Sequence, residues 1–256
     1  MKIIETPNPW DEELVELEND FGTKVAKEDK EWLEKLKILN EDVFKNDLKL
    51  NLFPEPYIGH PDAPIYLLNG NPGFHENDER FIHDVVFRDA IKKTLTHDYI
   101  NHPECGDFLY LNEKLKDKEF NNGIMTHPGY KWWTDHLGKL NEIIKPCPKV
   151  FNIEFFPYHS RTLDNLKKYF KSPYWPSFDY TRSLVLKAIK EEKIIVVMRL
   201  KKYWYGAVPG LKEYKNVIEL KNPQSVYITE KNVQFGVEAE ALCKATWGEL
   251  IKKCMI

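Results

Sequence analysis

Four short runs of apolar residues stand out along the chain. They are 64–70 (PIYLLNG), 149–156 (KVFNIEFF), 193–200 (KIIVVMRL) and 216–220 (NVIEL). In each run, Ile, Val, Leu and Phe follow one another with little alternation between apolar and polar positions. This pattern is typical of strands that are covered on both faces, as in a parallel sheet. The sequence therefore predicts four buried strands.

Stretches with helical periodicity lie between and after these runs. They cover about 79–95, 131–145 and 179–191, and a last one follows the fourth run at about 235–255. Strands that alternate with helices favour a sheet with helices packed on both of its faces. The predicted fold class is therefore α/β, a three-layer α/β/α sandwich with a four-stranded, mostly parallel central sheet.

Residues 10–47 precede the first strand, and their pattern predicts two helices. Asp11 is suited to cap the first helix, which is expected to end near Gly22, while Trp32 and Leu36 have helical spacing in the second. Residues 96–130 lack a regular period and mix turn formers with aromatic residues. We expect one domain over residues 1–256, with an N-terminal helical extension (about 1–50) and an insertion (about 96–130).

The composition excludes several classes of protein. The chain has 42% hydrophobic and 30% charged residues, with a formal net charge of −3, so no global charge attracts nucleic acid or anionic lipid. No apolar segment is long enough to span a bilayer, and the N-terminal residues turn acidic at once, unlike a signal peptide. We expect no membrane partner and a cytoplasmic location. The sequence makes no prediction of oligomeric state.

Neither a metal nor a cofactor is expected. The four cysteines are scattered and form no C-x-x-C pair, which argues against a zinc ribbon and against a disulfide framework. His75, His127 and His159 do not have the spacing of a metal-binding motif.

The loops that follow the four predicted strands are rich in polar and aromatic residues. They are 69–74 (NGNPGF), 156–161 (FPYHSR), 199–206 (RLKKYWYG) and 221–229 (KNPQSVYIT). Open parallel sheets bind ligands beyond the carboxyl ends of their strands. We therefore expect the four loops to converge on one site.

The first loop is not a phosphate-binding loop. It lacks both the G-x-x-x-x-G-K-[ST] and the G-x-G-x-x-G patterns, and Pro72 removes an amide donor that an anion would need. Asn71 has a neutral amide that donates and accepts hydrogen bonds but cannot act as a strong base. It is suited to hold a water molecule or a carbonyl group. Alternatively, Asn71 only caps the helix that follows the turn.

Two short motifs carry a resemblance to a known family. The stretch LLNGNPGF resembles the first motif of the uracil-DNA glycosylase superfamily, especially of its mismatch-specific and single-strand-selective branches. The stretch KNPQS after the fourth run resembles the second motif of the mismatch-specific branch, and LFPEPYIG is similar to the lead-in of that superfamily. There are departures: Gln224 stands where the family often has serine, and no acidic residue follows Gly70.

The resemblance implies an α/β/α fold and a set of site residues. Asn71 matches the asparagine that orients the attacking water, and Phe74 matches the residue that abuts the flipped base. The motif residues around Asn71 are expected to bind substrate, and those of the second motif match the loop that presses on the DNA backbone. These residues are Gly70, Pro72 and Gly73 in the first motif and Asn222, Pro223, Gln224 and Ser225 in the second.

Three further candidates come from position alone. His159 follows the second strand and could donate a proton to a departing base, although a structural histidine is the alternative. Tyr158 could stack on a base. Arg199 provides local positive charge, or alternatively pairs with a buried carboxylate.

Together these features predict a uracil-DNA glycosylase-like protein that hydrolyses the N-glycosidic bond of a damaged or mispaired base. Its expected partner is DNA with a flipped base, and the reaction needs no cofactor. One alternative is a non-catalytic member of the same fold that binds a nucleotide or nucleic acid. Another is a small-molecule hydrolase that uses His159. All of these require Asn71 and the 222–225 turn to meet at a single cleft.

Overall fold

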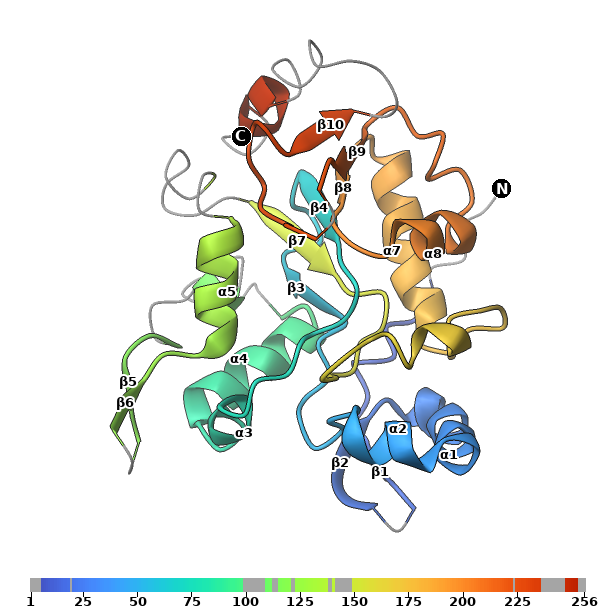
Figure 1. Cartoon of the computed structure of the whole chain (residues 1–256), viewed down its shortest axis with the longest axis vertical. Helices are drawn as coiled ribbons and strands as arrows, with labels where there is room; N and C mark the ends of the chain where they lie inside the picture. Colours follow the sequence, from blue (N-terminus) through green and yellow to red (C-terminus); the bar gives the residue numbers. More distant parts are fainter. Residues whose placement is uncertain are drawn as a thin grey trace.

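A mixed six-stranded sheet forms the centre of the molecule (Figure 1). The computed structural model describes residues 6–18, 20–98, 109–111, 115–120, 123–137, 140, 149–222, 224–235 and 247–252. The strand order in the sheet is β10-β9-β8-β4-β7-β3. The fold class is thus α/β, as the sequence predicts.

The four predicted strands are present and lie side by side. They are β4 (Ile65–Leu68), β7 (Val150–Ile153), β8 (Ile194–Val197) and β9 (Val217–Leu220). Strand β4 pairs in parallel with both β7 and β8, and β8 pairs in parallel with β9. All residues of β4, β7 and β8 are buried, which explains why their sequences are almost continuously apolar.

The prediction of a four-stranded sheet is wrong, because an antiparallel strand is added at each edge. Strand β3 (Tyr57–Gly59) pairs with β7, and β10 (Val233–Phe235) pairs with β9. Each edge strand has three residues, too few to show a periodic pattern. Strand β3 also follows Pro54 and Pro56 directly, and prolines so close to a segment are not typical of a strand inside a sheet.

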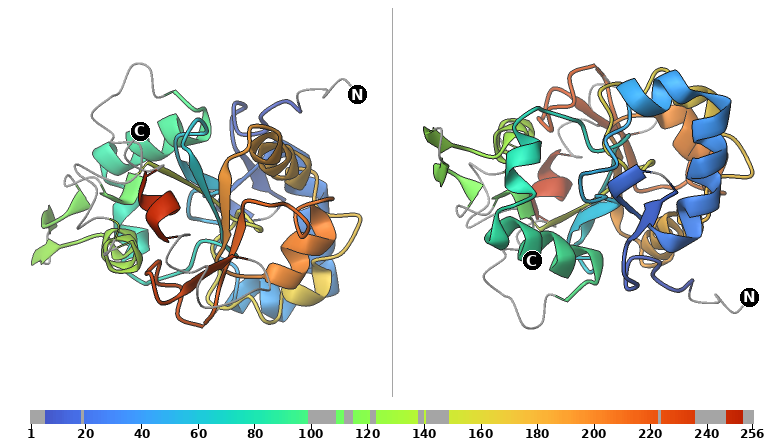
Figure 2. Two further views of the ribbon diagram at one scale, coloured as in Figure 1. Left: turned by 90° about the horizontal axis from the view of Figure 1, so that it is seen from above. Right: turned by 90° about the horizontal axis from the view of Figure 1, so that it is seen from below.

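Helices flank both faces of the sheet (Figure 2). The side chains of successive strand residues belong alternately to the core on one face and the core on the other. On one side lie α7 (Phe178–Lys190) and α8 (Lys201–Ala207), which pack on Tyr66, Leu68 and their neighbours. On the other side lie α4 (Val85–Leu95) and α5 (Pro128–His136), which pack on Ile65, Leu67 and theirs. This alternation places Asn69 on the α4/α5 side of the sheet.

The predicted helices are found with shorter bounds. Residues 79–95 form two helices, α3 (Asp78–Phe81) and α4, and residues 179–191 correspond to α7. Only the first part of the helix expected at 131–145 is described, as α5. Residues 247–252 of the expected last helix are helical, and most of the rest lies outside the described residues. No helix among those described is both long and apolar enough to cross a membrane.

The prediction of the first N-terminal helix is wrong. Residues of that segment form the antiparallel pair β1 (Val15–Leu17) and β2 (Asp20–Val25). Gly22 has a φ of 83°, a left-handed conformation that glycine adopts easily but a helix does not contain. The backbone N–H of Leu17 donates to Thr23 Oγ1, which strengthens the turn.

The second predicted helix exists as α1 (Lys30–Leu39) and is followed by α2 (Glu41–Asn46). Leu33 and Leu36 are buried in the core on the α7 side of the sheet. In the region 96–130, the described residues form a short 3-10 helix (Leu109–Leu111) and the hairpin of β5 (Lys118–Phe120) and β6 (Gly123–Met125).

Candidate functional site

A cleft of about 1100 Å³ opens at the carboxyl ends of the parallel strands. The residues that follow the strands line it: Asn69 and Asn71 after β4, Glu154 after β7, and Arg199 after β8. The start of α5 and the turn before it close the opposite side. The cleft therefore lies where open parallel sheets bind ligands.

The amide of Asn71 is held in a fixed orientation at the cleft. Its Nδ2 donates to the carbonyl of Pro72 (2.6 Å), to the carbonyl of Tyr158 (3.3 Å) and to Ser160 Oγ (2.8 Å). Three acceptors around one nitrogen identify it as the NH₂ group of the amide. The other atom, Oδ1, accepts no hydrogen bond from any residue that the structure describes. Asn71 thus lines the cleft with a fixed amide whose Oδ1 is left as an acceptor.

The loop that carries Asn71 is pinned to the loop after β7. The Phe156 N–H donates to the carbonyl of Gly70 (2.9 Å). A Cβ atom at Gly70 would lie 2.8 Å from Leu163 Cδ1 and 3.6 Å from Leu200 Cδ1. A side chain at this position would therefore require the end of the Leu163 side chain to move.

Phe74 and Arg161 line the cleft, and Lys49 lies beside the ring of Phe74. The ring of Phe74 lines the cleft, with Arg161 Cζ 4.8 Å and Lys49 Nζ 5.2 Å from its centroid. Cations at these distances are attracted to the face of an aromatic ring. Pro72 and Gly73, which the first motif predicts as binding residues, also line the cleft.

His159 is buried beside the cleft in an ion pair with Glu55. Its Nε2 lies 3.2 Å from Glu55 Oε1, and its Nδ1 lies 2.6 Å from the carbonyl of Gly73. Both ring nitrogens thus donate, as in the protonated form. Burial lowers the pKa of His159, but the charge of Glu55 and its hydrogen bond, with Asp78 and the Gly73 carbonyl, raise it to about 9.

The expectation that His159 protonates a departing base is therefore corrected. Both of its N–H groups already donate within the protein, to Glu55 and to the Gly73 carbonyl, so neither is left to donate to a base in the cleft. Its positive charge is balanced by the Glu55 carboxylate. Sequence reasoning missed Glu55, although it is the one charged residue in the proline-rich stretch LFPEPYIG.

Two more groups complete the polar cluster around Glu55. The hydroxyl of Tyr110 donates to Glu55 Oε1. Asp78 Oδ2 accepts from the His75 N–H (2.7 Å), and burial raises the pKa of Asp78 to about 6 while the charge of His159 opposes the rise. All of these residues line the cleft.

His127 adds a neutral imidazole to the same wall. Its Nδ1 accepts from the Gly129 N–H (3.0 Å), so its proton is on Nε2. Burial, with the charges of His159 and His75, lowers the pKa of His127 to about 3. The Nε2 atom has no hydrogen-bond partner among the described residues.

Glu154 and Asn69 line the cleft, and the fully buried Asn152 contacts Glu154 from within the sheet. Glu154 Oε1 accepts from Asn152 Nδ2 (2.8 Å) and from Asn69 Nδ2 (3.2 Å). Burial raises the pKa of Glu154 to about 8, against the hydrogen bond from Asn152. Sequence reasoning missed all three, yet each is a polar residue within or just after an apolar strand.

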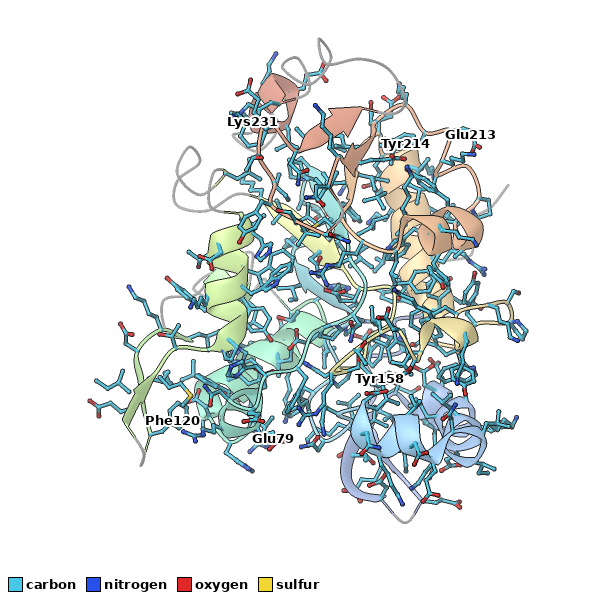
Figure 3. The ribbon with its side chains drawn as sticks, viewed as in Figure 1. Glu79, Phe120, Tyr158, Glu213, Tyr214 and Lys231 are labelled. Atoms are coloured by element: carbon cyan, nitrogen blue, oxygen red, sulfur yellow. The ribbon has the colours of Figure 1, made fainter. Side chains whose placement is uncertain are left out.

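Tyr158 does not face the cleft, which corrects its assignment as a substrate-binding residue. Its side chain is buried between the sheet and the N-terminal elements (Figure 3). The hydroxyl donates to Asp29 Oδ2 (2.8 Å) and accepts from the Ala26 N–H (3.1 Å). Tyr158 thus holds the N-terminal segment against the core.

Arg199 is exposed and lines the cleft, as the sequence predicts for a binding residue. It forms no ion pair with any carboxylate in the described part of the chain, so the alternative of a buried pair does not hold there.

The second motif reaches the same cleft through Gln224. Gln224 is exposed and lines the cleft together with Asn71. Asn222 and Ser225 do not line it but shape the turn: Asn222 Oδ1 accepts from the Gln224 N–H (3.1 Å), and its carbonyl accepts from the Ser225 N–H (3.1 Å). Pro223 lies outside the described residues. The two motif loops therefore meet at one cleft.

The site contains no evident metal centre, since the described residues include no group of three His, Cys, Asp or Glu side chains placed to hold an ion. Comparisons with protein-family models, with curated proteins and with solved structures find no match. The site's function must therefore be argued from its own chemistry.

Proposed function

We propose that the cleft receives a damaged or mispaired base flipped out of DNA and hydrolyses its N-glycosidic bond. The observation that carries this proposal is the fixed amide of Asn71, whose Oδ1 is left as an acceptor at the cleft. In a glycosylase of the family that the two motifs resemble, this acceptor holds the attacking water. The four parallel inner strands with helices on both faces are consistent with that family's fold.

The reaction needs positioning and charge rather than a strong base. The water oxygen bonds to the sugar C1′ as the C1′–N bond breaks, and the electron pair leaves with the base. The proton lost by the water is taken up by the departing base or by solvent. Positive charge builds on the sugar and negative charge on the base. Asn71 Oδ1 orients the water, while Arg199 supplies positive charge beside the cleft.

The mouth of the cleft offers contacts to the DNA strand. Arg161 and Lys49 flank Phe74, and Lys131 lines the cleft. Such cations contact phosphates without reading sequence. Phe74 and Gln224 are placed to abut a base or the gap that it leaves.

An oligonucleotide assay tests the proposal. The protein is incubated with single- and double-stranded oligonucleotides that contain uracil, hypoxanthine or a mismatch, and alkali then breaks the strand at each abasic site. Asn71→Ala is expected to reduce cleavage ~100-fold, because the water loses its orienting group. Asn46→Ala, on the exposed surface of α2, is the matched control and should retain full activity. Absence of cleavage of all these substrates by the wild-type protein would contradict the proposal.

A second candidate is hydrolysis of a free nucleoside or nucleotide. The supporting observation is the mixed charge at the mouth, where Asp135 and Asp164 lie among the lining residues with Lys131 and Lys167. Lys167 is already paired with Asp164 at 2.7 Å. Release of free base from nucleosides, without cleavage of any oligonucleotide, would favour this second function.

A further inference from the structure

We propose that Glu154 and Asn69 recognise a ligand edge in which a hydrogen-bond acceptor lies next to an N–H donor, with Glu154 donating as a neutral carboxylic acid. The inference rests on the proposed function, because it names the ligand chemistry of the same cleft. Its basis is a set of buried polar atoms that the protein itself leaves without partners.

The geometry leaves one oxygen of Glu154 unused. Its Oε1 accepts from two amide groups, those of Asn152 and Asn69. Its Oε2 is buried and has no hydrogen-bond partner in the described structure, and the same holds for Asn69 Oδ1. Buried polar atoms are nearly always paired, because an unpaired one costs about 1–3 kcal/mol. Both residues line the cleft, so a ligand there can supply the missing partners.

The surroundings favour the neutral acid. Burial is the main cause that raises the pKa of Glu154, and the charge of Glu55 adds to it. The hydrogen bonds from Asn152 and Asn69 and the charge of Arg199 act in the opposite direction. Tyr110, the other titratable group that senses Glu154, is buried with a raised pKa and stays neutral. Near neutral pH, Glu154 therefore carries a proton, and Oε2 can donate it in a hydrogen bond.

The two residues together offer one donor and one acceptor. Glu154 follows β7 and Asn69 follows β4, and these neighbouring strands are hydrogen-bonded in parallel. The Glu154 O–H can donate to a carbonyl oxygen or ring nitrogen, while Asn69 Oδ1 accepts from the adjacent N–H. Lactam edges, as in uracil, and amidine edges, as in cytosine, offer this arrangement. When Glu154 ionises, its Oε2 becomes an acceptor that faces the acceptor of the ligand, and binding weakens.

Binding of free bases to the full chain tests the inference. The probes are uracil and cytosine with N1 blocked by a methyl group, as the sugar blocks it in DNA, so that only the pairing edge offers an N–H donor. The controls are 1,3-dimethyluracil and 1-methyl-N4,N4-dimethylcytosine, which lack that donor. At about pH 6.5, we expect each control to bind at least ~10-fold more weakly than its parent. Between about pH 6.5 and pH 9.5, affinity for cytosine, which stays neutral over this range, should fall ~10-fold or more as Glu154 ionises.

Two variants separate this role from a structural one. Glu154→Gln keeps a donor at every pH, so between the two pH values its affinity for cytosine should fall clearly less than that of wild type; any remaining fall is due to the loss of charge on His159, whose pKa is about 9. Glu154→Ala should lose binding at both. If Glu154→Ala does not fold, the pH dependence of binding by the isosteric Glu154→Gln tests the inference by itself. Equal binding of parent and control bases, no saturable binding of either parent, or the same pH dependence in Glu154→Gln and wild type would each overturn the inference.

The oligonucleotide assay, run in parallel, keeps the two proposals apart. Discriminating base binding without any strand cleavage refutes the proposed function and leaves the inference standing. Strand cleavage that is unchanged in both Glu154 variants and independent of pH refutes the inference and leaves the proposed function standing.

Discussion

Asp29 and Glu154 are both buried carboxyl groups, but their surroundings differ. Asp29 lies between the N-terminal elements and the start of α7, whereas Glu154 lines the cleft. Burial is the first cause that raises the pKa of each group, to about 6 for Asp29 and about 8 for Glu154. A raised pKa therefore does not distinguish the two.

Hydrogen bonding does distinguish them. Asp29 Oδ1 accepts from the Ser177 N–H (2.8 Å), and its Oδ2 accepts from Ser177 Oγ (2.6 Å) and from the Tyr158 hydroxyl (2.8 Å). Both oxygens are satisfied, so Asp29 connects parts of the fold. Glu154 has one satisfied oxygen and one without a partner, beside a cleft. A buried carboxyl thus points to a binding site when its hydrogen bonding is incomplete and space for a ligand adjoins it.

The largest expected effect is that of Asp29→Ala. It leaves the Tyr158 hydroxyl and two groups of Ser177 without their acceptor, so the free energy of unfolding should fall by about 3–5 kcal/mol. Urea denaturation measures this loss, and cytosine binding by the folded fraction should not change. Asp179→Ala, which removes an exposed carboxylate of α7, is the control and should stay within about 0.5 kcal/mol of wild type. If Asp29→Ala lowers the free energy of unfolding as little as the control does, the conclusion that Asp29 stabilises the fold is wrong.

The second effect is a dependence of stability on pH. The folded pKa of Glu154 is raised to about 8 from 4.5, so above pH 4.5 the unfolded chain releases this proton while the folded one keeps it. Its contribution to stability is complete below pH 4.5 and is lost as the pH rises to about 8, by about 1.4 kcal/mol per pH unit. Glu154→Gln should abolish this loss.

The charge of His159 contributes to the same trend at higher pH. Its pKa is raised to about 9 from 6.5, so its contribution is complete below pH 6.5 and is lost as the pH rises to about 9. Urea denaturation at a series of pH values, with wild type and Glu154→Gln compared at each, isolates the part due to Glu154. Parallel curves for the two proteins would show that Glu154 is already ionised at neutral pH.

A smaller effect is expected from Tyr158→Phe. The substitution removes one donor to Asp29 and the acceptor of the Ala26 N–H, so the free energy of unfolding should fall by about 1–2 kcal/mol. Tyr174→Phe is the matched control, because no hydrogen bond to its hydroxyl is found among the described residues. If Tyr158→Phe binds bases more weakly and Tyr174→Phe does not, Tyr158 contributes to ligand binding after all.

The smallest effect on stability is expected from Gln224→Ala at the rim of the cleft. An exposed side chain of this kind changes the free energy of unfolding by less than about 0.5 kcal/mol. Cleavage of uracil-containing oligonucleotides should nevertheless fall several-fold, while binding of free cytosine stays unchanged. Equal cleavage by wild type and Gln224→Ala would exclude the second motif loop from DNA binding.

The sequence alone determined the four inner strands and the edge at which the cleft opens. Their apolar residues are continuous because both faces of the sheet are covered, and polar residues follow where each strand ends. The positions of Asn71, Phe74, Arg199 and Gln224 at the cleft follow from this local pattern. The strands β1, β3 and β10 could not be predicted, since strands of three residues depend on the partner strand rather than on their own pattern.

Only the tertiary structure decided which polar residues face the cleft and which are used by the fold. Tyr158 and His159 are neighbours in the chain, yet one reaches back to Asp29 and the other to Glu55. Glu154 and Asn69 are 85 positions apart in the chain and meet because β7 and β4 pair in parallel. Hydrogen bonds between distant segments decide the charge of each group and which of its atoms stay available to a ligand. These bonds cannot be predicted from the local sequence.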